Sequence, residues 1–375
     1  MKLRTFFKKW HEYSPIFTMV TVFLFPIVLA LHILSIFFEP IANFVNRYPA
    51  SAVRFLLAKV TGIFPFSLAE ILIFLIVPAT VVAIVFAFRL CMKEDPKPSR
   101  YYLSYLIGFF LLLYTGFVLT LGTSYFTAPL DKELSLDKKG VSAKELYAAC
   151  EEVVHEMEPL LDGIAFEASG LSRMPYSFDE LNGKLNDAYK TVTKDYPFIS
   201  SLSSNVKGIL LSEPLTYTHL SGIYAYFTGE ANVNTNFPDS TLAFTMAHEM
   251  AHQRGIGRED EANFVAFLVC MASDDSYIRY SGYYEMFKYL VNALYDADQE
   301  LFKKAYEIAD ERLVKEIVGF NDFYEKYQDN LAADIAGSIN NSYQQMQGIE
   351  AGIKSYGLVV DLAVAYHQKY GHFDR

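Results

Sequence analysis

Three long apolar segments near the start of the chain constrain its fold more than any other feature. Residues 17–38, 71–88 and 101–130 contain no Asp, Glu, Lys or Arg. An α-helix of about 20 apolar residues can cross the hydrocarbon core of a bilayer. The sequence therefore predicts three transmembrane helices, at about residues 17–38, 71–88 and 101–127. A cleaved signal peptide is the alternative for the first segment, but its apolar run exceeds the roughly 7–15 residues typical of one.

Basic residues in the flanking loops predict how these helices are oriented. They precede the first segment and separate the second from the third: Lys2, Arg4, Lys8 and Lys9, then Arg89, Lys93, Lys97 and Arg100. Because basic loops stay in the cytoplasm, both regions are expected there. Residues 39–70 then face outward, with residues 52–66 along the membrane interface. The sequence thus divides into a transmembrane region, 1–130, and an extracytoplasmic domain, 131–375, in a multi-pass protein of the cell membrane.

The two regions carry opposite charge. Residues 1–130 contain 11 Lys and Arg against 5 Asp and Glu, and the remaining 245 residues contain 21 against 38. Binding to nucleic-acid phosphates needs clustered Lys and Arg, so an acidic domain argues against a nucleic-acid partner. The basic flanks around apolar segments point instead to the lipid bilayer. Nothing in the sequence indicates an oligomeric state.

The region after residue 131 is expected to be mainly helical with a small sheet. Helical periodicity marks residues 142–161, 177–196, 283–306, 311–327, 331–347 and 357–370. Runs of β-branched and aromatic residues at 206–211 and 222–227 predict strands. The fold class is therefore a helical membrane segment followed by a mainly helical α+β domain. Cys150 and Cys270 lie in apolar helical contexts, where they either pair or stay as buried free thiols.

The residues most indicative of chemistry are His248, Glu249 and His252, in the sequence HEMAH. The surrounding segment reads as a helix that begins at Thr241, with Asp239 or Ser240 as its cap. Positions i and i+4 of a helix lie about 40° apart, so both imidazoles project from one face. Two neutral imidazoles suit Zn²⁺, and Glu249 borders the same site as a possible general base. Chance occurrence on an ordinary amphipathic helix is the alternative.

A third ligand is expected just after the helix. Gly255 and Gly257 can end it and reverse the chain. A second helix would then begin near Glu259, with Asn263 one turn later on the same face. Glu259 is the favoured third ligand, and Glu261 is the alternative because either carboxylate can serve as a first-turn Glu that favours the helix dipole.

The two motifs H-E-x-x-H and E-x-x-A-N-x-x-A resemble those of gluzincin metallopeptidases. The second is similar to the E-x-x-A-N of the ImmA/IrrE class and the E-x-x-A-D of the HtpX class. In those families the first Glu of the second motif is a zinc ligand, which implies that role for Glu259 and a zincin-like fold for the domain. The spacer of six residues between His252 and Glu259 is shorter than in either class. The order of three apolar N-terminal segments, then GEANVN, HEMAHQRG and EDEANF, also resembles a family of bacterial membrane proteins with a domain of unknown function, over most of the chain.

The expected function is zinc-dependent hydrolysis of peptide bonds in a peptide or protein substrate. Glu249 would take the proton of the attacking water, and Asn263 would orient Glu259. Tyr283, Tyr284 or Tyr356 could stabilise the oxyanion. Residues 222–227 or 231–234 could bind the substrate as a sheet edge, or form a plain core hairpin. The alternative functions are a membrane-tethered zinc sensor and a non-catalytic envelope scaffold.

Overall fold

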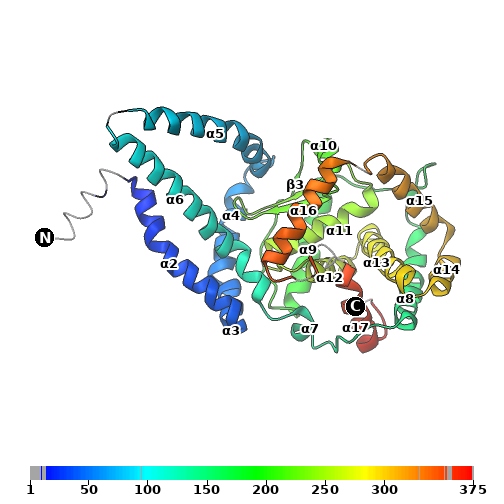
Figure 1. Cartoon of the computed structure of the whole chain (residues 1–375). Coiled ribbons are helices and arrows are strands. Elements are labelled where there is room, and N and C mark those ends of the chain that lie inside the picture. The colour runs from blue at the N-terminus through cyan, green and yellow to red at the C-terminus, as the bar shows by residue number, and fades with distance from the viewer. Residues whose placement is uncertain are drawn as a thin grey trace.

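The computed structural model describes residue 10 and residues 14–93, 95–328, 330–349, 351–352 and 357–373. The described chain is mostly helical with two small sheets, which confirms the expected predominance of helix. Long apolar helices extend from one side of a compact helical body (Figure 1). The basic residues Lys2, Arg4, Lys8 and Lys9, and also Tyr356, lie outside the described residues.

The apolar segments form three helices: α2 (Ile16–Phe37), α5 (Leu68–Cys91) and α6 (Lys97–Thr120). Helices α2 and α6 are long and apolar enough to cross a membrane, and α5 makes a third if it counts as one bent span. The bend in α5 is 42°, between Ile76 and Pro78, because a proline inside a helix removes a backbone hydrogen bond and clashes with the preceding turn. Helices that could span a membrane thus occur in the predicted segments. Helices α2 and α5 match the predicted bounds within three residues, whereas α6 begins at Lys97 and ends at Thr120, before the predicted end near residue 127.

Helices α2 and α6 pack closely against one another. A Cβ on Gly108 of α6 would lie 2.4 Å from Oγ1 of Thr18, so only glycine allows this approach. Thr18 also donates to the backbone oxygen of Ser104, and His32 bonds the Tyr114 hydroxyl at 2.7 Å. Small residues and interhelical hydrogen bonds are what hold helices together in lipid. By contrast, the described side chains of α5 between residues 71 and 88 are almost all exposed, as lipid-facing side chains are.

The segment between α2 and α5 packs against the helical body. It contains α3 (Glu39–Val45), a π-helical turn at Asn46–Ala50 and α4 (Ser51–Thr61). The Arg54 side chain is fully buried and donates to Asn46 and to the backbone oxygen of Thr120. Asn46 in turn donates to the backbone oxygen of Gly255. This segment and the helical body therefore lie at the same ends of α2 and α6.

The start of α5 is attached to the same body by two carboxylates. Glu230 accepts hydrogen bonds from the backbone N–H groups of Leu68 and Ala69, where a negative charge favours the helix dipole. Glu70 accepts from the N–H groups of Leu210 and Leu211. The predicted boundary at residue 130 thus separates regions that share many contacts, and the division into two domains stays a prediction.

The body begins with η2 (Gly122–Phe126) and α7 (Leu130–Glu133), which lead into α8 (Ala143–Leu161) and α9 (Phe178–Asp195). Helices α8 and α9 match the predicted ranges within a residue. Each starts with a capping box, Ser142 with Glu145 and Ser177 with Glu180, which satisfies the free N–H groups of the first turn. The hairpin of β1 (Ala165–Phe166) and β2 (Ser172–Arg173) lies between them.

The second sheet has three strands in the order β3-β5-β4. The central strand β5 (Glu230–Val233) runs parallel to β3 (Lys207–Gly208) and antiparallel to β4 (Gly222–Ala225). The predicted strand at 206–211 is shorter than expected, because Ser212–Thr216 forms helix α10. Of the two segments considered for a sheet edge, β4 is an edge strand, whereas 231–234 lies mostly in the central strand.

Helices α11 (Asp239–Gln253) and α12 (Glu259–Met271) form the centre of the core. The predicted capping of α11 is wrong: Pro238 is its cap residue, and the Asp239 carboxylate instead accepts from the N–H of Met174. Gly255, with φ of +94°, reverses the chain between the helices as expected. Cys150 on α8 and Cys270 on α12 are buried free thiols, so they do not pair.

The remaining helices surround this centre. They are α13 (Ser276–Ala297), α14 (Gln299–Ile308), α15 (Glu311–Glu325), α16 (Leu331–Met346) and α17 (Val359–Tyr370). The single helix predicted at 283–306 is two, because Asp298 caps α14 with its side chain. Helix α13 packs on α8 and α11, while α16 lies at the side of the body nearest the membrane helices (Figure 1).

Candidate metal centre

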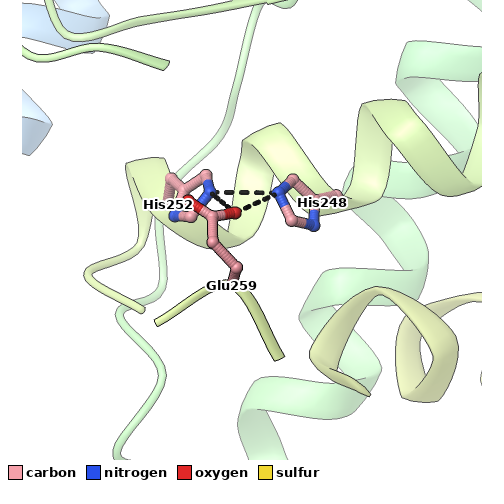
Figure 2. A group of neighbouring side chains, drawn as sticks. All are labelled: His248, His252 and Glu259. Atoms are coloured by element: carbon pink, nitrogen blue, oxygen red, sulfur yellow. Dashed lines mark hydrogen bonds and ion pairs between the residues drawn. The ribbon is translucent and has the colours of Figure 1, made fainter. Parts of the chain in front are cut away.

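Three side chains from α11 and α12 converge at the turn between these helices. Figure 2 shows the two imidazoles on one face of α11, with the Glu259 carboxylate reaching between them. The Nε2 atoms of His248 and His252 are 3.0 Å apart, and Oε2 of Glu259 is 3.2 and 3.3 Å from them. All three residues are buried. The predicted i, i+4 geometry is thus present, together with the favoured third residue.

This arrangement fits a divalent metal ion of the Zn²⁺ type. With bonds of about 2.0–2.1 Å, a tetrahedral ion needs its ligand atoms roughly 3.3 Å apart, close to the observed separations. The Nδ1 atom of His252 lies 2.7 Å from the backbone oxygen of Ile256. A proton on Nδ1 leaves the Nε2 lone pair free to bind a metal, as outer partners of ligand histidines commonly ensure.

Burial and mutual electrostatic interaction shift the pKa values of these three side chains strongly. Burial lowers the pKa of His252, but the Glu259 carboxylate outweighs it and the pKa is raised to about 9. Burial also lowers the pKa of His248, and at this residue the effect of burial outweighs the opposing effect of Glu259, so the pKa is lowered overall. For Glu259, burial raises the pKa, yet the two imidazoles hold it well below its usual range. A carboxylate that stays ionised beside two basic nitrogens is a donor set for a cation.

Glu249 lies beside these ligands, pressed against strand β4. A Cβ on Gly222 would lie 2.5 Å from Oε1 and 2.8 Å from Cδ of Glu249, so the carboxyl group rests directly on the glycine. Burial raises the pKa of Glu249 to about 8. Its Oε2 atom is buried and has no hydrogen-bond partner among the described residues. A buried carboxyl oxygen without a partner is costly, which points to a ligand or water at this position.

The second oxygen of Glu259 is held by a residue that the sequence did not indicate. Nε2 of Gln344, on α16, donates to Oε1 of Glu259 at 2.9 Å, and Gln344 is almost fully buried. The expectation was that Asn263 would orient Glu259. Because Gln344 is 85 residues away along the chain, only the packing of α16 over the site reveals this contact.

The alternative ligand Glu261 is engaged elsewhere. Its Oε1 atom accepts from the N–H of Leu130 at 2.8 Å and from Arg258 at 2.5 Å. Arg258 also donates to the backbone oxygen of Thr127. Glu261 therefore connects α12 to the segment that follows η2, and it is not part of the cluster of His248, His252 and Glu259.

Asn263 lies on the other side of the cluster, where it interacts with His248 and with the hydroxyl of Tyr289. Tyr289 on α13 was not among the expected oxyanion donors. Of those, Tyr283 and Tyr284 are fully buried on the same helix, and neither lines the cavity beside the cluster.

That cavity has a volume of about 450 Å³. Its lining includes His248, Glu249 and Asn263 at the metal centre, Tyr289 on α13 and Gly222 on β4. Helix α16 closes it with a face of small side chains: Ala333, Ala336, Gly337 and Asn340. His219 also lines it, with Nε2 2.7 Å from the backbone oxygen of Tyr327, although its sequence context indicated no ligand-like role. A volume of this size accommodates a small ligand or several amino-acid side chains.

Comparison with known proteins gives a family but no function. The family described as "Protein of unknown function (DUF3810)" matches residues 46–364. This range includes the whole metal centre, Gln344 and the segment that carries Asn46 and Arg54. No curated protein and no solved structure matches the chain.

Proposed function

Because the chain belongs to the DUF3810 family, whose function is unknown, we propose a function from the site itself: a membrane-anchored, zinc-dependent metallopeptidase of the gluzincin type. The observation that carries the proposal is the convergence of His248, His252 and Glu259 with Glu249 beside a cavity. A zinc ion held by the three ligands would lower the pKa of a water molecule and polarise the peptide carbonyl. Two histidines, one carboxylate and an open position are the donor set of such catalytic sites.

The side chains around the centre supply the proton transfers. Glu249 is the general base: its carboxylate takes the proton of the attacking water and delivers it to the leaving amine. Burial raises the pKa of Glu249 to about 8. A cation at the ligand cluster favours the ionised carboxylate, which is the form that a base needs. Gln344 and the backbone oxygen of Ile256 orient Glu259 and His252.

Strand β4 is suited to hold an extended peptide beside Glu249. The N–H of Asn234 donates to the backbone oxygen of Ser221, and the register pairs Ile223 with Asn232. Residues in an antiparallel pair alternate in direction, so the backbone groups of Gly222 and Tyr224 point away from β5. A substrate strand that pairs with this edge would pass the Glu249 carboxyl, and this sheet edge beside the metal helix is the feature that supports a zincin-like domain.

Tyr289 is the residue that we assign to oxyanion stabilisation. It lines the cavity together with His248 and Glu249, and its hydroxyl interacts with Asn263. A neutral phenol placed beside the reacting carbonyl can donate a hydrogen bond to the developing oxyanion. Burial keeps the pKa of Tyr289 above its usual value, so the hydroxyl retains its proton at neutral pH.

Metal analysis and peptide digestion of the full-length protein test the proposal. The wild type in detergent should contain about one zinc per chain, and His248→Ala/His252→Ala should contain none. Glu249→Gln should keep the metal and lose hydrolysis of a peptide library read by mass spectrometry. His155→Ala and Glu158→Gln on the exposed surface of α8 are matched controls. A metal-loaded protein whose peptide products do not depend on Glu249 would contradict hydrolysis and favour the zinc-sensor function.

Substitution of the two acidic residues tests the third ligand. We expect Glu259→Gln to abolish tight zinc binding, because it removes the carboxylate charge between the imidazoles. Glu261→Gln should retain zinc, since its carboxylate binds Leu130 and Arg258 instead. Loss of zinc in Glu261→Gln at unchanged thermal stability would reverse this assignment.

The placement of the site suggests where substrates are found. Basic residues between α5 and α6 favour a cytoplasmic turn there, which puts the metal centre on the opposite side of the membrane. We therefore propose membrane-proximal or cell-envelope polypeptides as substrates. In intact cells, an impermeant thiol reagent should label Val318→Cys on the body and spare Cys91 at the end of α5. The reverse pattern would place the site in the cytoplasm.

A further inference from the structure

Helix α16 has its apolar side chains on the outside. Leu331, Ile335, Ile339 and Met346 are 73%, 52%, 65% and 82% exposed. Their spacing of about three to four residues, or multiples of it, puts them on one stripe of the helix. The opposite stripe, which faces the cavity, carries Ala333, Ala336, Gly337 and Asn340, and Gln344 reaches Glu259 from it. A helix that covers a polar site with small residues and exposes its bulky apolar ones normally has a partner on the exposed side.

Both ends of α16 lie where the membrane helices emerge. At its C-terminal end, the Tyr343 ring contacts Phe117 of α6, and its hydroxyl accepts a hydrogen bond from Tyr125 just beyond that helix. A few residues before α16 begins, Lys326 pairs with Glu213 of α10. Glu213 follows Leu210 and Leu211, whose backbone N–H groups donate to Glu70 of α5. Helix α16 therefore extends between the end of α6 and the start of α5, at the membrane side of the body (Figure 1).

Other apolar residues at this side are exposed as well. Leu210 is 79% exposed, and Ile63, at the end of α4, is 78% exposed. Ile63 precedes Leu68, the first residue of α5, by a few positions. The backbone N–H of Leu210 donates to the Glu70 carboxylate of α5. Exposed apolar side chains thus occur both on α16 and beside the start of α5, at the side of the body from which the apolar helices extend.

We propose that the stripe of Leu331, Ile335, Ile339 and Met346 is a lipid-binding surface, which lies in the headgroup region of the leaflet reached by the end of α6. Apolar faces of interfacial helices bury about 5–10 Å into this region. Helix α16 is then a cover that touches lipid on one side and the metal centre, through Gln344, on the other. A second copy of the chain is the other occupant that such a stripe could accept, and the experiment separates the two.

A fluorescent label on the stripe tests this inference without reference to catalysis. In full-length protein with Cys91→Ser, an environment-sensitive dye is attached to Ile339→Cys or, independently, to Met346→Cys. Val318→Cys on the exposed face of α15, 52% exposed in the wild type, is the control. In nanodiscs of phosphatidylcholine, both stripe labels should emit at shorter wavelength than the control. Brominated acyl chains should quench on the order of half of their emission and leave the control unchanged.

Two results would overturn the inference. Stripe labels with the same emission and quenching as the Val318→Cys control would show that water covers α16. Labels that are shielded but not quenched by brominated lipid, with energy transfer between chains that grows with protein concentration, would show that a second copy covers it. Since neither readout depends on metal or hydrolysis, failure here leaves the proposed peptidase activity untouched, and the reverse also holds.

Discussion

Adding one methyl group at Gly222 should disable the proposed base without touching the metal ligands. In Gly222→Ala the new Cβ would lie 2.5 Å from Oε1, 2.7 Å from Cγ and 2.8 Å from Cδ of Glu249. Comfortable contacts between such atoms are about 3.5 Å, so the carboxyl group must move by roughly 1 Å. The free volume for this movement is on the cavity side, where Glu249 already forms part of the lining.

The expected loss follows from the size of that movement. A displacement of about 1 Å in a catalytic group can cost on the order of 100-fold in rate, which is about 2.7 kcal/mol of transition-state stabilisation. The three atoms nearest to the new methyl group all belong to Glu249 and none to His248, His252 or Glu259, so zinc content should stay at the wild-type level. We expect kcat of a library-derived peptide to fall about 100-fold, with a smaller change in KM.

The assay needs a control from the same sheet. In Gly208→Ala on β3, the added Cβ would meet only the methyl group of Thr235, at 3.2 Å, so activity should remain near the wild-type level. Wild-type kcat in Gly222→Ala would refute the assignment of Glu249, in its observed position, as the base. Loss of zinc in Gly222→Ala would instead show that the strand supports the ligands themselves.

Of three further predictions, two concern the surroundings of the centre and one concerns the start of α13. If the Tyr289 hydroxyl stabilises the oxyanion, Tyr289→Phe should lower kcat by about 10²–10³-fold at constant zinc content. The control Tyr283→Phe should leave kcat unchanged, because the Tyr283 ring packs on Phe267 in the core. Equal effects of the two substitutions on kcat would contradict the role of Tyr289. Gln344→Ala should weaken zinc binding about 10–100-fold, measured in competition with a chelator. The control Gln345→Ala, at the exposed neighbouring position, should not weaken it. Unchanged zinc affinity in Gln344→Ala would show that the hydrogen bond to Glu259 has no role in zinc binding. Asp275 caps α13 and pairs with Lys184 at 3.0 Å. Burial raises the pKa of Asp275, but Lys184 and backbone N–H groups lower it more. A lowered pKa stabilises the fold above the unfolded-state value of about 3.9, and this stabilisation is lost as the pH falls through the folded-state value. Asp275→Asn keeps a capping side chain but loses the charge that pairs with Lys184 and favours the helix dipole, so it should unfold more easily by about 1 kcal/mol at pH 7. The difference should shrink below about pH 4, and an equal difference at low pH would refute the electrostatic origin.

Local patterns in the sequence were sufficient to predict the long apolar helices, most other helices and the cluster of His248, His252 and Glu259. Residues 17–37 and 101–120 are helical because their composition leaves few alternatives. His248 and His252 share a face because four residues nearly complete a turn. Glu259 could be named because only a glycine turn separates it from His252. Patterns within about fifteen residues of sequence were therefore enough to predict that the three side chains lie close together.

Features that depend on distant segments were missed. Gln344, Tyr289 and Gly222 come from three elements that approach α11 only in the folded chain. A glutamine on an amphipathic helix or a glycine at the start of a strand has no distinguishing pattern. The capping of α11 was misjudged for the same reason, since Asp239 bonds the N–H of Met174, 65 residues earlier. The choice between Glu259 and Glu261 likewise needed the contact of Glu261 with Leu130.

The contact of Asn46 and Arg54 with the turn at Gly255 has a consequence for how this protein can be divided. That turn joins the helix with both histidines to the helix with Glu259, and Asn46 bonds its backbone while Arg54 packs against its α-carbon. The segment between α2 and α5 therefore supports the turn that separates the two histidines from Glu259. We expect that a fragment beginning at residue 131 would lack this support, so that proteolytic release or gene fission at that point would loosen the turn between the candidate ligands.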